Sequence, residues 1–80
     1  MHYRKTKLQR EQSVKVFNKI NGMFTLQKIA DKVNRHVTTV QAWKYKGVPK
    51  DMAPLLSEMV HGLFTPEQIA PELLDENLKK

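Results

Sequence analysis

The stretch from residue 29 to residue 49, IADKVNRHVTTVQAWKYKGVP, constrains the fold of this chain more than any other. It holds two runs with helical spacing of apolar residues, separated by the three polar residues 34–36. The Gly-Val-Pro sequence at 47–49 follows the second run, and a Gly with a Pro soon after it is typical of a helix end. The stretch therefore predicts two helices joined by a tight turn. Asn34 can take the left-handed backbone conformation that such a helix exit demands.

Apolar residues in both runs fall where one buried face of a helix requires them. Thr25 is the predicted cap of the first helix, and Ala30 is small enough for a second helix to cross closely. The buried residues of the first run are Leu26, Ile29, Ala30 and Val33, and those of the second are Val37, Val40 and Trp43. Residues 25–47 are thus predicted to form a helix-turn-helix, whose second helix enters the major groove of DNA.

The N-terminal part predicts one more helix. Thr6 and Gln9 have the spacing of a capping box, so a helix is expected to begin there and to stop at Gly22. Ser13 is an alternative cap for its start, and residues 1–12 are then a basic arm. The expected inner face of this helix consists of Val14, Phe17 and Ile20, with Lys15 and Lys19 in solvent.

Two shorter helices are predicted in the C-terminal part. Asp51 suits the N-cap of one, which leaves Pro54 in its first turn and ends at Gly62. The sequence from Thr65 to Gln68 opens the other, and Pro71 ends it. Residues 72–80 are expected to form a short helical turn and a polar tail at 75–80. No segment alternates apolar and polar residues as strands do, so the predicted fold is all-α. It is a single domain, residues 1–80, built as a small bundle of about five helices that contains the helix-turn-helix.

Charge is distributed unevenly along the chain. Residues 1–50 hold twelve Lys and Arg against two acids, a net charge of +10, whereas residues 51–80 carry −4, which gives +6 in total. A positive charge confined to one half is typical of a face that binds a polyanion. A basic surface that only keeps the protein soluble is the alternative reading of the charge.

The sequence lacks the patterns of most catalytic and metal sites. Because it has no Cys, it excludes disulfides, thiolate metal sites and a thiol nucleophile. The histidines lie far apart without metal-ligand spacing, and the acids Glu67, Glu72, Asp75 and Glu76 are expected to favour a helix dipole or solvation. We therefore expect no enzyme activity, cofactor, metal or small-molecule substrate. With no apolar run long enough to cross a bilayer, a cytoplasmic protein without a membrane partner is predicted.

The outward face of the helix predicted after residue 36 has side chains suited to reading bases. Thr38, Gln41 and Tyr45 share one face, away from Val40 and Trp43. Gln can bind adenine through two hydrogen bonds, and Thr can offer its hydroxyl or its methyl group. Cations and hydroxyls around this face predict phosphate contacts, at Arg4, Lys5, Lys7, Arg10, Lys28, Arg35, Thr39, Lys44 and Lys46.

On these residues the chain resembles the Cro and YdaS-like helix-turn-helix proteins of phages and prophages. The resemblance covers residues 24–74 and includes the later run HGLFTPEQIAPELL. It implies a small all-α regulator of the lambda-repressor-like class that binds double-stranded DNA as a homodimer on a palindromic operator, usually as a repressor. It also implies operator-facing positions at His36, Val37, Thr38, Gln41 and Tyr45.

Two other functions stay open. The acidic, Leu-rich C-terminal half predicts an apolar patch, formed by Met59, Leu63, Phe64, Leu73, Leu74 and Leu78. Such a patch suits a protein-interaction or antitoxin-like module, although it suits a homodimer contact equally well. A DNA packaging or recombination accessory factor would share the fold and differ in the DNA that it binds.

Overall fold

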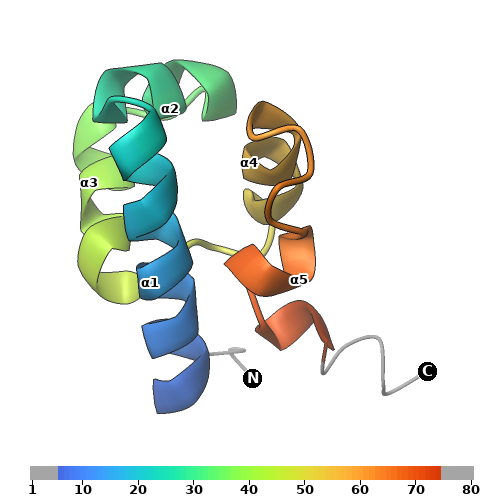
Figure 1. Ribbon diagram of the computed structural model, residues 1–80. Coiled ribbons are helices and arrows are strands. Elements are labelled where there is room, and N and C mark those ends of the chain that lie inside the picture. The colour runs from blue at the N-terminus through green and yellow to red at the C-terminus, as the bar shows by residue number, and fades with distance from the viewer. Residues whose placement is uncertain (1–5, 75–80) are drawn as a thin grey trace.

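The structure is a computed structural model that describes residues 6–74. Within this range the regular secondary structure is helical, and there is no strand (Figure 1). The helices are α1 (Lys7–Met23), α2 (Leu26–Val33), α3 (Val37–Lys46), α4 (Ala53–Met59) and α5 (Pro66–Ile69). A further helical turn covers residues 72–74. The prediction of an all-α protein is confirmed. The predictions for Arg4, Lys5, Asp75, Glu76, Leu78 and the tail 75–80 lie outside the described residues.

Helix α1 begins with the predicted capping box. The Thr6 hydroxyl oxygen accepts from the Gln9 amide at 3.1 Å, and the Thr6 amide donates to Gln9 Oε1 at 2.8 Å. The alternative start at Ser13 is wrong, because that residue lies fully buried inside α1.

The other end of α1 lies one residue beyond the predicted stop at Gly22. The helix continues to Met23 because the Phe24 amide still reaches the Ile20 carbonyl at 2.9 Å. The predicted inner face also needs a correction, since Val16 is buried where Val14 is only half-buried.

Helices α2 and α3 are joined by the tight turn that the sequence predicts. The Thr25 hydroxyl caps α2 by accepting from the Lys28 amide at 3.2 Å. Asn34 ends α2 in the left-handed conformation, with φ 56° and ψ 47°, and the Arg35 amide donates to the Ala30 carbonyl at 3.1 Å. At its C-terminal end, α3 stops before Gly47, whose φ of 85° explains the glycine.

The core lies between α1, α2 and α3 and extends to the C-terminal helices. Phe17 of α1 meets Trp43 of α3 edge to face, with ring centroids 5.9 Å apart and an interplanar angle of 82°. Since Ser13 contacts Val48 just beyond α3, the two helices run in opposite directions. Buried apolar residues from every helix complete the core: Val16, Ile20, Ile29, Ala30, Val33, Val40, Val48, Ala53, Leu56, Val60, Ile69 and Ala70.

Helix α4 differs from its prediction at both ends. Asp51 is not its N-cap; Met52 is, without a side-chain hydrogen bond, because a backbone turn leads into the helix instead. The helix ends at Met59 rather than at Gly62, since His61 and Gly62 both take left-handed conformations with φ of 55° and 79°.

Helix α5 is short and packs on α1. Thr65 and Gln68 form the predicted capping box, with hydrogen bonds of 3.2 and 2.9 Å. The helix ends at Ile69, two residues before Pro71, as expected from a residue that cannot continue a helix. Helix α1 packs against α3 and also against α5, so it separates the two (Figure 1).

Candidate functional site

The clearest candidate site is the solvent-exposed face of α3. Val40 and Trp43 fix the opposite side of this helix in the core, at 0% and 4% exposure. Thr38, Gln41 and Tyr45 are all exposed, and 70% of the Tyr45 side chain lies in solvent. The row therefore presents two hydroxyls and one amide on a helix whose orientation is set by packing.

The start of α3 carries the other two predicted base-reading residues. His36 is exposed and serves as the N-cap of α3, with its Nδ1 accepting from the Thr38 amide at 3.1 Å. Val37 is half-buried and packs against the core, so only part of it faces solvent.

Cations lie near the C-terminal end of α3. Lys44 is half-buried and Lys46 is exposed on the helix itself. Because α1 runs opposite to α3, its exposed first-turn residues Lys7 and Arg10 lie at the end of the bundle where α3 ends (Figure 1). The structure thus brings these four predicted phosphate contacts to one end of α3.

The remaining described phosphate candidates are also exposed. Arg35 lies in the turn before α3, where its Nη1 donates to the Asn34 carbonyl at 3.5 Å. Lys28 lies in the first half of α2, and Thr39 in the first turn of α3.

Lys32, a cation of the basic half, is paired within the protein. Lys32 Nζ lies 2.7 Å from Glu58 Oε1, which joins α2 to α4. This hydrogen bond and the positive charge of Lys32 hold the pKa of Glu58 below its ordinary value of 4.5. The Lys32 ammonium group thus binds a carboxylate of α4.

Ser13 is the residue that the sequence analysis missed. Its hydroxyl donates to the Ile69 carbonyl at 2.6 Å and accepts from the Val48 amide at 2.7 Å, and the side chain is fully buried. It thereby joins α1 to the exit of α3 and to the end of α5. The sequence holds one weak indication of this role. Ser13 lies three and four residues before Val16 and Phe17, so helical periodicity places it on the same buried face of α1.

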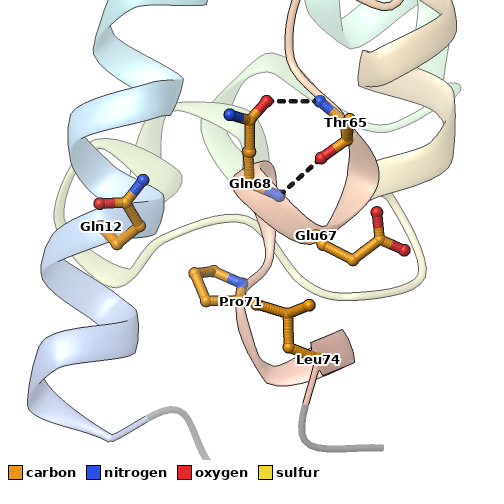
Figure 2. Close-up of a pocket in the computed structure, with 6 residues that line it drawn as sticks. All are labelled: Gln12, Thr65, Glu67, Gln68, Pro71 and Leu74. Carbon is orange, nitrogen blue, oxygen red and sulfur yellow. Dashed lines mark hydrogen bonds between the residues drawn. The ribbon is translucent and has the colours of Figure 1, made fainter. Parts of the chain in front are cut away.

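A second feature is an open hollow of about 550 Å³ between α1 and the C-terminal part. Figure 2 shows Gln12 of α1 on one side and Pro71 and Leu74 on the other, with the Thr65–Gln68 capping box above them. Leu74 is 51% exposed, and Glu67 also lines the hollow.

The predicted apolar patch is only partly present. Leu63 is exposed and lies after α4, whereas Met59, Phe64 and Leu73 pack against the core. Glu72 also differs from its prediction: it is 4% exposed, because the helical turn that contains it and Leu73 folds against the core.

Within residues 6–74, no three His, Asp or Glu side chains lie close enough together to hold a metal ion. Across the same residues, none of the helices has the length and apolar character needed to cross a membrane.

No protein family, curated protein or solved structure matches this chain. The resemblance to Cro and YdaS-like proteins accordingly stays a prediction from the residues of α2, α3 and the turn between them.

Proposed function

We propose that the chain is a sequence-specific regulator that binds double-stranded DNA through a helix-turn-helix formed by α2 and α3. It is a Cro-type repressor of a phage or prophage and acts in the cytoplasm of a bacterial cell. The observation that carries this proposal is the exposed row on α3, Thr38, Gln41 and Tyr45, opposite a face that Val40 and Trp43 hold in the core. A recognition helix needs this combination of rigid placement and free hydrogen-bonding groups.

Each part of the row has a distinct role in this proposal. Gln41 can bond the N6 and N7 edge of adenine, which supplies about 1–3 kcal/mol of discrimination. Thr38 offers its hydroxyl to a base or its methyl to thymine, and Tyr45 reaches a base edge or a phosphate. The cations at the end of α3 and the start of α1 hold the phosphates on one side, and Arg35 holds them on the other.

A second copy of the chain is the partner that fits the hollow between α1 and α5. Leu8, which is 78% exposed, lies one helical turn before Gln12, so the same surface has an apolar projection beside an apolar hollow. Two identical surfaces related by a two-fold axis need such self-complementarity. The resulting dimer matches a palindromic operator, with half-sites about 34 Å apart.

The proposal is tested by selecting random duplexes with the wild-type protein and with Gln41→Ala. We expect a two-fold symmetric site for the wild type and a loss of preference at symmetric positions for the variant. Asn18→Ala, which removes an exposed amide from α1, is the matched control and should select the wild-type site. If the wild-type protein enriches no sequence, the proposal is wrong.

Salt dependence provides a second test. If six to eight phosphates are neutralised per dimer, the logarithm of affinity should fall against the logarithm of salt concentration with a slope of about −5 to −7. A flat response contradicts a phosphate-binding role for the basic half.

The dimer surface is tested by sedimentation. Leu8→Ser should shift the protein toward the monomer, whereas Leu63→Ser, which changes an exposed leucine after α4, should not. A wild-type protein that stays monomeric with and without DNA contradicts this surface.

A protein-interaction module is the second candidate function, favoured by the same hollow and by the exposed Leu74. It predicts a monomer that binds a specific protein partner, keeps that partner in Gln41→Ala and protects no DNA. The sedimentation and selection experiments separate it from the regulator.

A further inference from the structure

The side chain of His36 differs in kind from the other side chains that cap helices in residues 6–74. Thr6, Thr25 and Thr65 cap α1, α2 and α5 with hydroxyl oxygens, whereas α3 is capped by an imidazole nitrogen. Thr is among the residues that serve best at this position, and His is not among them. Capping alone therefore does not explain why a His stands at position 36. The question is what its second ring nitrogen can bind.

The hydrogen bond of the cap fixes the chemistry of that second nitrogen. Nδ1 accepts from the Thr38 amide at 3.1 Å, so it carries no proton. A neutral imidazole has one protonated nitrogen, which must then be Nε2. The His36 side chain is exposed, so Nε2–H is a hydrogen-bond donor accessible from solvent.

The position of this donor relates it to the reading face. His36 immediately precedes α3, and the cap holds its ring beside the amide of Thr38, the first residue of the exposed row. Residues at the start of a recognition helix are the ones that meet base edges and nearby phosphates. Held in this way, the ring has less rotational freedom to lose on binding.

We infer that His36 divides its two ring nitrogens between folding and recognition: Nδ1 caps α3, and Nε2–H donates one hydrogen bond to an acceptor atom of the duplex. The inference rests on the proposed DNA-binding function and adds a direction to it. A donor pairs with purine N7, guanine O6, thymine O4 or a phosphate oxygen, and it rejects the amino groups of adenine and cytosine. His36 is thus a specificity-determining residue where the acceptor belongs to a base, and a positioning contact where the acceptor is a phosphate oxygen.

Two substitutions separate the two roles. Asn places an amide oxygen near the position of Nδ1 and is a good helix cap, but it is too short to replace Nε2. Gln places an amide N–H near the position of Nε2, but it is not a good cap. His36→Asn should keep the wild-type urea midpoint and bind DNA about five- to tenfold more weakly, the effect of one hydrogen bond. His36→Gln should lower the midpoint and keep the affinity of the folded protein within about twofold.

The probe is the duplex that the wild-type protein enriches most, and His61→Asn is the matched control. His61 follows α4 with φ of 55°, a conformation that Asn tolerates, so this variant should keep both the midpoint and the affinity. Four single replacements identify the acceptor: a neutral methylphosphonate for a phosphate, a 7-deaza analogue for a purine, 2-aminopurine for guanine to remove O6, and 5-methyl-2-pyrimidinone for thymine to remove O4. The replacement that removes the accepting atom should weaken the wild type and leave His36→Asn unchanged.

The outcomes distinguish this inference from the proposed function. If the wild type binds its duplex and His36→Asn binds equally well, the inference is overturned and the regulator stands. If the wild type binds no duplex, the proposed function fails and the recognition role of Nε2 fails with it. Nitrogen NMR of the imidazole tests the capping role independently: a proton on Nε2 supports it, and a proton on Nδ1 overturns it.

Discussion

The N-terminal segment, α1 to α3, and the C-terminal segment, α4 and α5, are built in different ways. Every helix of the N-terminal segment begins with a side-chain cap, and α1 is 17 residues long. In the C-terminal segment, α4 has seven residues and no side-chain cap, and α5 has four residues. Helices that short do not persist alone in water, and of the five labelled helices only α1 is longer than the roughly 12–15 residues below which a lone helix is marginal. The C-terminal segment therefore depends on its contacts with the N-terminal one.

The same division separates the charges and the candidate binding surfaces. The N-terminal segment carries the cations and the exposed row on α3, whereas the C-terminal segment contributes acids and most of the lining of the apolar hollow. Ser13 and the Lys32–Glu58 ion pair connect the two segments. A domain of this size can thus place a polar reading face and an apolar contact face on opposite sides of one helix, α1.

The largest expected effect tests the packing of the N-terminal segment. Trp43→Ala removes the ring that meets Phe17 and should lower the free energy of unfolding by about 3–5 kcal/mol. Tyr45→Ala, on the exposed face of the same helix, should change it by no more than about 0.5 kcal/mol. Urea unfolding followed by circular dichroism measures both. Equal effects of the two variants would contradict the assignment of inner and outer faces.

The next effect tests the link between the segments. Ser13→Ala leaves the buried Val48 amide and the Ile69 carbonyl without their partner, which should cost about 2–4 kcal/mol in the free energy of unfolding. Asn18→Ala, on the exposed side of α1, is the control and should cost little. If Ser13→Ala unfolds at the same urea concentration as this control, the segments are held together without the serine.

A Gly→Ala substitution should change the free energy of unfolding in opposite directions in the two segments. Gly22→Ala lies in the last turn of α1 with open space around it, and should stabilise the protein by about 0.5–1 kcal/mol. Gly62→Ala also meets no neighbouring atom, but its φ of 79° should make the variant about 1–2 kcal/mol less stable. Thermal unfolding of both variants checks the signs. A gain in both would mean that the turn after α4 can relax.

The smallest effect concerns the ion pair between the segments and depends on pH. The pKa of Glu58 is lowered in the folded protein, so the pair contributes stability above the ordinary pKa of 4.5 and loses it as the pH falls through the lowered value. Glu58→Gln should be slightly less stable than the wild type near neutral pH and equally stable in strong acid. Because the pair is exposed, added salt should also reduce the difference. Urea midpoints that differ equally at both pH values would contradict this coupling.

The accuracy of the sequence predictions also differs between the two segments. The capping boxes at Thr6 and Thr65 and the left-handed Asn34 were predicted correctly, because each depends on residues within a few positions of one another. The start of α4 was predicted wrongly at Asp51, because a backbone turn after Pro49 provides the entry and leaves no need for a side-chain cap.

For the candidate site, the sequence predicted which residues share the exposed face of α3, since helical periodicity and the apolar positions Val40 and Trp43 determine it. Periodicity could not reveal that Ser13 joins α1 to residues 35 and 56 positions away, nor that Lys32 is paired with Glu58. It also gave no sign of the hollow beside Gln12, which α1 and α5 form together.

The sequence by itself determined the helical class, the tight turn between α2 and α3, and the exposed row on α3, because local hydrogen bonds and the 3.6-residue period decide these features. Only the tertiary structure decided which polar groups are committed inside the protein and which stay free, since partners distant in the chain meet only after folding. His36 belongs to both: its place before α3 follows from the sequence, and the nitrogen that it leaves for a ligand follows from the fold.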